Sequence, residues 1–344
     1  MRLKSIFGLL SLILVATAAW VWFTQTWYSN SQENELITFQ TPISDEAFNK
    51  YIETAIGVKV YPSMAKLAKW RGLKLNLEGT TSLVIQPKTS FWNLIRLLVR
   101  FQREQQLVTI NSNWDLETLD KKMSEKFSWE KGGLKRFLSD EETYKLWNEL
   151  TFSEGEIHPL SWQALFIPNS YLFKRKTTIE SFMDKMSKSA HDFWTKERML
   201  AAHRINLTPV DVVKLASIVT KESNFTGEYG KIASTYKNRL AKGMLLQADP
   251  TVVFARGRAG RVLNRDTKIE SPFNTYLYTG LPIGALCIPN LNAVDSCLFG
   301  ANYPYLYFCA KADLTPQHDF AITLEEHNKN AQRFHRALNA LKRN

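Results

Sequence analysis

The sequence predicts an α+β protein in which two folded regions follow a single N-terminal transmembrane helix. An uncharged apolar run from Ile6 to Phe23, a first region of short alternating strands and helices, and a longer region dominated by amphipathic helices predict this organisation. With 344 residues, 44% of them hydrophobic, the chain is long enough to bury two cores. We expect five parts: a cytoplasmic tip and anchor (1–28), a linker (29–35), a small α+β subdomain (36–112), a helical connecting part (113–207) and a C-terminal core (208–344).

The N-terminal run is just long enough to cross a bilayer as a helix. Arg2 and Lys4 precede it, which predicts a cytoplasmic N-terminus and an exported body. Ala16-Thr17-Ala18 offers the alternative of a cleaved signal peptide. The apolar run continues past that site, so we favour a retained anchor in the inner (cytoplasmic) membrane. The net charge of +11 favours an acidic partner: nucleic acid, anionic lipid or an acidic polymer. An exported body argues against nucleic acid.

The subdomain at residues 36–112 shows the patterns of a small α+β unit but no group of catalytic residues. A spacer that holds the next domain away from the membrane is its plain interpretation. We expect strands at Leu36–Ile43, Thr81–Ile85 and Val108–Ile110, and helices that begin at Ser44, Pro62 and Phe91.

The connecting part, residues 113–207, is predicted to be helices separated by loops. Pro168-Asn169-Ser170-Tyr171 is expected to be a turn before the basic patch Lys174-Arg175-Lys176, which is either a solvated face or a contact for an acidic polymer. The expected helices lie near Leu116–Phe127, Glu141–Leu150 and Thr178–Trp194, with breaks at Lys131–Gly133 and Glu154–Pro159.

One helix of the C-terminal core carries an unusually placed carboxylate. Thr208-Pro209 predicts its start, because threonine caps free N–H groups and proline suits the first helical position. At steps of three and four residues one face then carries Val212, Leu215, Val219 and Glu222. A carboxylate that continues an apolar stripe is partly desolvated, which raises its pKa and suits a general acid near neutral pH. The alternative is a glutamate that simply reaches solvent or caps a neighbouring helix.

Further elements follow this helix in order. A second helix is expected over Glu228–Leu240, with Tyr236 in its apolar stripe and Gly243 as its stop. Asp249-Pro250 reads as the N-cap and first position of a short helix. The polar loop from Asn274 to Gly284 is of the kind that lines sites. We also expect a buried strand at Tyr305–Cys309, a turn before His318 and a closing basic helix at Leu324–Leu341.

Metal chemistry has no support in the sequence. The three cysteines, Cys287, Cys297 and Cys309, are not spaced as metal ligands, and no pair of histidines has metal-ligand spacing. One disulfide with a spare thiol and three free thiols are both compatible with this pattern.

An ordered series of segments carries a specific resemblance. The segments are Ile218–Ser223, Ala233-Ser234, Asn238–Leu240, Gly243–Val252, Phe273–Tyr276, Gly280–Pro282, Tyr305–Phe308, His318 with Phe320, and Glu326–Asn328. Together they resemble the YceG/MltG family of endolytic murein transglycosylases. The anchor and the subdomain at 36–112 also fit that family, whose members are similar to a LysM module there; the resemblance makes 208–344 the YceG-like catalytic core.

The chain departs from the family pattern at several positions. The family's usual Glu-Gly before a Pro-Asp-Thr-Tyr turn is here Gln163-Ala164 before Pro168–Tyr171. The loop usually written Gly-Leu-Pro-Pro-Gly-Pro-Ile has Ile283, Ala285 and Leu286, and a usual tyrosine is Phe273. These changes affect the expected grip on substrate but leave Glu222 in place.

The resemblance implies cleavage of the β-1,4 bond between MurNAc and GlcNAc inside peptidoglycan strands, with 1,6-anhydroMurNAc ends as product. It makes Glu222 the catalytic acid and base and implies no cofactor. We expect Asn238, Gln247, Asp249, Asn274 and Tyr276 to bind sugar hydroxyl and N-acetyl groups, each with the alternative of local hydrogen bonding. The implied partners are nascent glycan strands, and the penicillin-binding proteins that polymerise them.

Two other functions compete with this interpretation. In the first, Glu222 and a second carboxylate, Asp249, deliver water as a muramidase pair, because ordinary glycoside hydrolysis uses two carboxyl groups. In the second, the protein is a non-catalytic wall-binding protein, and Glu222→Gln has no effect.

Overall fold

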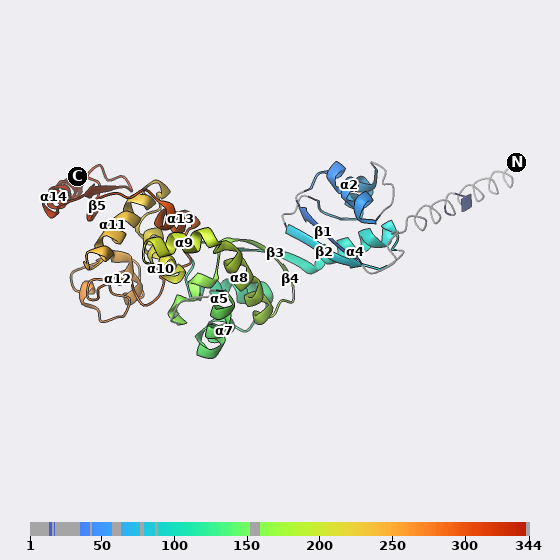
Figure 1. Cartoon of the computed structure of the whole chain (residues 1–344), viewed down its shortest axis with the longest axis horizontal. Helices are drawn as coiled ribbons and strands as arrows, with labels where there is room; N and C mark the ends of the chain where they lie inside the picture. Colours follow the sequence, from blue (N-terminus) through green and yellow to red (C-terminus); the bar gives the residue numbers. More distant parts are fainter. Residues whose placement is uncertain are drawn as a thin grey trace. The chain divides into compact units, whose positions relative to one another are not determined.

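The structure, a computed structural model, confirms the α+β class. It describes residues 14–15, 17, 35–41, 43–56, 63–75, 79–86, 89–151 and 159–341. The chain divides into two compact units (Figure 1). The first contains the described residues up to Val108 together with Tyr171–Arg175, and the second contains Thr109–Ser170 and the chain from Lys176 onward.

The predicted membrane anchor lies outside the described residues, except for Leu14, Val15 and Thr17. The linker before residue 35 and most of the expected break at Glu154–Pro159 lie outside them as well. Within the described parts of the chain, no helix combines the length and the apolar character that crossing a membrane requires.

In the first unit, two antiparallel strands alternate with helices. β1 (Glu35–Thr41) pairs with β2 (Gly79–Ile85), so that Glu35 lies opposite Ile85 and Thr41 opposite Gly79. Between them come α2 (Asp45–Ile56) and α3 (Ser63–Trp70), and α4 (Phe91–Glu104) follows. The Ser90 hydroxyl caps α4 by accepting from the Asn93 amide, 3.2 Å away. The helices bury a common core formed by Phe48, Ile52, Met64, Leu94 and Leu98.

A second pair of strands corrects one prediction. β3 (Gln105–Ile110) pairs with β4 (Asn169–Lys174), where the sequence had suggested a turn at Pro168–Tyr171. The turn-forming residues misled the prediction, since Tyr171 and Phe173 are both buried and alternate with less buried residues, as in a strand. The chain leaves the first unit along β3 and returns to it briefly along β4.

The second unit is mainly helical. Three of its helices match expected ones within two residues: α5 (Leu116–Phe127), α7 (Glu141–Thr151) and α8 (Ile179–Phe193). The remaining helices before the closing one are α6 (Gly133–Ser139), α9 (Lys196–Arg204), α10 (Pro209–Glu222), α11 (Tyr229–Ala241), α12 (Asp249–Arg256) and α13 (Leu291–Phe299). Short 3-10 turns occupy Pro159–Leu165, Thr226–Glu228 and Asp266–Lys268.

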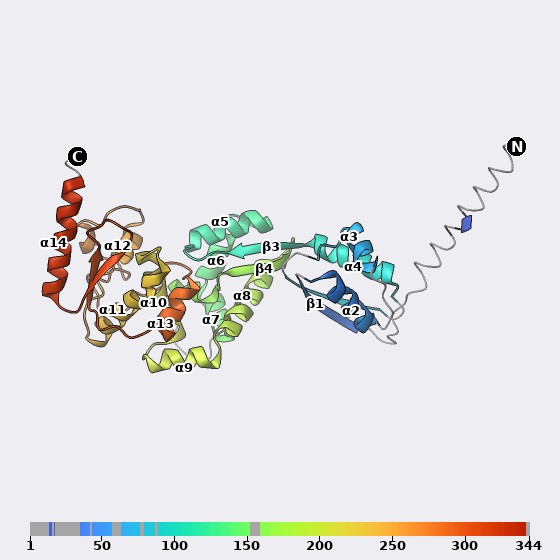
Figure 2. The same cartoon turned by 90° about the horizontal axis from the view of Figure 1, so that it is seen from above.

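Helix α10 is the centre of this unit. Thr208 and Asp211 form a reciprocal capping box around the Pro209 start, which confirms the predicted beginning. Ten of its 14 residues are buried, so α10 is covered on nearly all sides and not only along the predicted stripe. It packs against α11, α12 and α13 (Figure 2). This surrounding holds the end of α10, and therefore Glu222, in a fixed position.

The C-terminal elements differ partly from expectation. β5 (Tyr307–Ala310) begins two residues later than predicted, is half-buried and pairs antiparallel with β6 (His318–Ala321), a strand the sequence did not predict. The closing helix α14 (Leu324–Leu341) has the predicted bounds and packs on both strands. All three cysteines are free thiols; Cys287 and Cys297 are buried, which raises the pKa of each to about 12.

Candidate active site

A cleft of about 820 Å³ in the second unit contains Glu222. Its walls come from the start of α5, the segment around Trp162, the end of α10, and α12 with the loop that follows it. Asp249 lines the same cleft, as do the aromatic side chains of Trp162 and Phe254. The cleft therefore combines carboxylates with apolar and aromatic surface, which is the composition expected of a ligand site.

Glu222 is held by a tyrosine from the neighbouring helix. It is the last residue of α10, and its Oε1 accepts a short hydrogen bond from the hydroxyl of Tyr236 in α11. Tyr236 is only 2% exposed and packs edge-on against Phe308, with ring centroids 5.7 Å apart. A buried hydroxyl needs a partner. The carboxyl of Glu222 supplies that partner, so its position is fixed from α11.

The surroundings raise the pKa of Glu222 to about 7. Desolvation by burial is the largest cause, and the negative charge of Asp249 acts in the same direction. The Tyr236 hydrogen bond and the positive charge of Arg239 act in the opposite direction. The raised pKa expected from the apolar stripe is thereby confirmed. Near neutral pH the group can both donate and accept a proton.

The raised pKa predicts a dependence of stability on pH. The pKa of Glu222 is about 7 in the folded state and 4.5 in the unfolded chain, so the folded state binds this proton more tightly. Its stabilising effect is complete below about pH 4.5 and is lost as pH rises through about 7, a difference of about 3 kcal/mol. We expect Glu222→Gln to melt several degrees above the wild type at about pH 8.5. The gap should close toward pH 4.5 in thermal unfolding followed by calorimetry; a constant gap would contradict the shift.

Arg239 is a buried cation beside this carboxyl. Its Nε donates to the Leu306 carbonyl at 2.7 Å, and its Nη1 donates to the carbonyl of Leu246 at 2.9 Å. The sequence predicts Tyr236 as a residue of the apolar stripe and predicts no role for Arg239. Both polar groups lie two to three helical turns from the start of α11, and α11 packs beside the helix that carries Glu222.

Asp249 accepts a hydrogen bond of 2.6 Å from the Tyr276 hydroxyl, and burial together with this contact raises the pKa of Tyr276. The expectation that Asp249 caps the next helix is wrong. The cap position belongs to Ala248, Asp249 is the first residue of α12, and no side chain caps this end. Its carboxylate is therefore free to face the cleft.

The side-chain amide of Asn274 binds backbone groups. Asn274 is 1% exposed; its Nδ2 donates to the carbonyls of Thr267 and Ile269 (3.0 and 2.8 Å), and its Oδ1 accepts from the Tyr276 amide (3.0 Å). Asn274 thus shapes the loop that presents Tyr276.

Asn238 and Gln247 also lie outside the cleft lining. Asn238 Nδ2 donates to the carbonyls of Tyr303 and Tyr305, each at 2.8 Å. Gln247 is exposed, with a left-handed φ of 50°, and its backbone N–H donates to the Thr275 carbonyl at 3.0 Å. Of the predicted site residues, the structure brings Glu222 and Asp249 into one cleft, with Tyr276 bound to Asp249.

Two departures from the family pattern contact each other. Gln163 lines the cleft, and its Nε2 donates to the carbonyl of Ala285 at 2.7 Å. An amide makes this bond at any pH, whereas a glutamate at the same place could do so only when protonated. The glutamine therefore suits a buried position beside a carbonyl.

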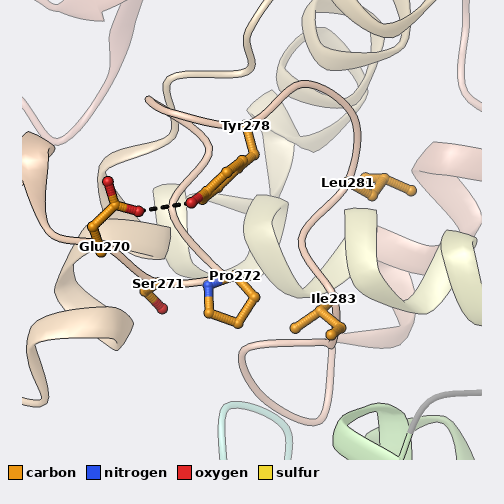
Figure 3. Close-up of a pocket in the computed structure, with 6 residues that line it drawn as sticks. All are labelled: Glu270, Ser271, Pro272, Tyr278, Leu281 and Ile283. Carbon is orange, nitrogen blue, oxygen red and sulfur yellow. Dashed lines mark hydrogen bonds between the residues drawn. The ribbon is translucent and has the colours of Figure 1, made fainter.

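A separate surface pocket of about 530 Å³ shares no lining residue with the Glu222 cleft. Figure 3 shows Tyr278 donating to Glu270, 2.7 Å apart, with Pro272 and Ile283 below them. Tyr278 is half exposed, and its hydrogen bond to Glu270 raises its pKa. Among the residues that the structure describes, no group of three or more His, Cys, Asp or Glu side chains could hold a metal ion.

The fold and the cleft define an α+β protein with a carboxyl of raised pKa at the end of a helix, in a cleft that also contains aromatic side chains. The profile of the YceG-like family matches residues 63–333, and the chain belongs to this family. Its fold resembles the crystal structure of a YceG-like protein from Listeria monocytogenes. The TM-score is 0.56 at 23% identity, over 87% of this chain and 99% of that one.

Two curated relatives are both called endolytic murein transglycosylases. The protein of Bacillus subtilis strain 168 is 32% identical over 191 residues, which are 53% of this chain and 50% of that protein. The protein of Streptococcus pneumoniae strain D39 is 32% identical over 175 residues, 49% of this chain and 31% of that protein. The chain thus matches half or less of the length of these relatives.

Proposed function

We propose that the protein is an endolytic lytic transglycosylase that cleaves the MurNAc-β-1,4-GlcNAc bond within peptidoglycan strands. The observation that carries this proposal is Glu222, a carboxyl with a pKa of about 7 in a cleft large enough for sugar residues. Phe254, which is 38% exposed, offers apolar surface on which a sugar ring can pack. Membership of the YceG-like family and the names of the two relatives support the same reaction.

In this mechanism one carboxyl performs two proton transfers. Protonated Glu222 donates its proton to the glycosidic oxygen, and the bond from that oxygen to C1 of MurNAc breaks with oxocarbenium character. The resulting carboxylate then takes the proton of the MurNAc C6 hydroxyl as its oxygen bonds to C1. The products are a 1,6-anhydro ring and a free GlcNAc hydroxyl, with Glu222 protonated again. The Tyr236 hydroxyl stabilises the carboxylate between the two steps.

Asp249 assists by its charge, since it raises the pKa of Glu222 and keeps the acid protonated near neutral pH. A muramidase would instead use a second carboxylate to activate water. The two reactions give products that differ in mass by one water.

To test this, uncrosslinked glycan strands are incubated with the part of the chain from residue 35 onward. The products are then analysed by mass spectrometry. Internal fragments that end in 1,6-anhydroMurNAc are the expected result. Fragments heavier by one water would replace the proposal with a hydrolase. Intact strands, under conditions in which a known lytic enzyme cuts them, would favour a wall-binding protein.

The setting of this reaction belongs to the proposal as well. We propose that residues 1–28 anchor the protein in the inner membrane, with the catalytic region on the periplasmic (extracytoplasmic) side beside penicillin-binding proteins. The apolar run from Ile6 to Phe23 supports the anchor. The order β1–α2–α3–β2 in the first unit supports the LysM-like interpretation of residues 36–112.

A further inference from the structure

The loop after α12, residues 257–262, is built around a buried arginine. Arg256 is the last residue of α12, and its side chain is 5% exposed. Its Nε donates to the Arg258 carbonyl and its Nη1 to the Arg261 carbonyl, both at 2.9 Å, and its Nη2 bonds to the Gly260 carbonyl. Because one guanidinium binds three backbone carbonyls, the path of the whole loop is fixed from inside.

The charge of that guanidinium is neutralised on its other side. Arg256 Nη1 lies 2.7 Å from Asp266 Oδ2, and Asp266 is buried too. The same oxygen accepts from the Leu263 amide at 3.0 Å. Gly257 and Gly260 have φ angles of 68° and 116°, in the left-handed region that favours glycine. These features make a rigid, tightly curved loop rather than a loose connection.

The rigid loop presents two cations to the cleft. Arg258 and Arg261 are both exposed, and both line the cleft that contains Glu222. Within the described ranges of the chain, no carboxylate lies within 4.0 Å of either guanidinium. Three of the four acids that share the cleft have other partners: Asp115 caps α5 through the Thr118 amide (2.8 Å), Asp249 binds Tyr276 and Glu222 binds Tyr236. The fourth, Glu117, is exposed and makes no ion pair with either arginine. Two like charges three residues apart on a fixed loop do not stabilise the fold, so a ligand is the better reason for them.

We propose that residues 257–262 form a carboxylate-binding arm that recognises the stem peptides of the glycan strand. This inference rests on the proposed function and names the part of the substrate that the arm binds. A stem peptide hangs from MurNAc through an amide bond and carries free carboxylates along its length and at its end. An arginine side chain binds a carboxylate with two parallel N–H···O bonds, a geometry that lysine lacks. The arm therefore favours peptide-bearing strands whose carboxylates are free.

The test compares two forms of one substrate. Uncrosslinked strands are used either unmodified or after carbodiimide coupling to ammonia, which converts their peptide carboxylates to neutral carboxamides without changing the glycan. The variants are Arg258→Gln, Arg261→Gln and the double variant. Arg265→Gln is the matched control, because the Arg265 side chain is 74% exposed, close in sequence and absent from the cleft lining. Cleavage gives kcat and KM, and binding of both substrates to a Glu222→Gln background is measured in parallel.

On unmodified strands we expect each arginine variant to raise KM about three- to fivefold and the double variant about tenfold or more, with kcat little changed. On amidated strands the variants and the wild type should have the same KM, and Arg265→Gln should match the wild type on both substrates. Equal losses on both substrates would overturn the proposal in favour of a glycan contact or a structural role. If the arginine variants bind both substrates as well as the wild type does, the two arginines are solvated surface residues, and the proposal is overturned as well.

The binding measurement separates this inference from the function on which it rests. If wild type cleaves neither substrate, the lytic reaction fails. Tighter binding of unmodified strands that depends on Arg258 and Arg261 would still establish the arm. If cleavage occurs but binding is indifferent to the carboxylates, the arm fails and the lytic reaction stands.

Discussion

Replacing Glu222 by glutamine is expected to lower kcat for strand cleavage by at least about a thousandfold. General acid or base catalysis by one group contributes about 10² to 10⁴, and here the same group serves in both steps. Glutamine keeps the shape of the side chain, and its carbonyl can still accept from Tyr236, but it has no proton to donate to the glycosidic oxygen. The measurement is the rate at which anhydro ends appear on uncrosslinked strands at about pH 6.

The loss must come from chemistry and not from unfolding. Binding of strands should stay within about twofold of the wild type, because an isosteric neutral side chain replaces a carboxyl that is largely protonated at this pH. Glu180→Gln is a suitable control, since this exposed glutamate lies in the first turn of α8 and away from the cleft. A Glu222→Gln variant that keeps more than about a tenth of wild-type kcat would assign the acid to another residue.

The features of α10 that place Glu222 could be predicted because they are local. Thr208, Pro209 and Asp211 act within one helical turn. The spacing of apolar residues along the helix can be recognised without knowing which elements pack against it. The raised pKa followed from the same pattern, since burial is its largest cause. Local signals of this kind also gave the bounds of α5 and α14.

The remainder of the site depends on contacts between residues distant in sequence. No spacing rule says that Tyr236, 14 residues away, donates to Glu222, or that Asn274 supports Tyr276 instead of facing a sugar. β4 and β6 were missed for the same reason, because each is defined by its pairing with another strand. The side-chain amides of Asn238 and Asn274 donate to backbone carbonyls distant in sequence, which no local pattern predicts.

Tyr236→Phe is expected to move the pH profile of cleavage toward higher pH and to lower kcat about ten- to a hundredfold. Glu222 must be protonated to act as acid, so activity falls as pH rises through its pKa of about 7. The Tyr236 hydrogen bond lowers that pKa by favouring the carboxylate. Its loss therefore raises the pKa of Glu222 and moves the falling limb upward. The lower kcat reflects a carboxylate intermediate that lacks a buried hydrogen bond, worth about 1–3 kcal/mol.

Asp249→Asn provides the opposite change in the same cleft. The negative charge of Asp249 raises the pKa of Glu222, so a neutral asparagine of the same shape should move the falling limb to lower pH. Its carbonyl can still accept from the Tyr276 hydroxyl, which limits structural disturbance. Profiles of kcat from about pH 5 to 9 for the two variants should thus shift in opposite directions. Falling limbs that shift in neither variant would mean that the titrating group is not Glu222.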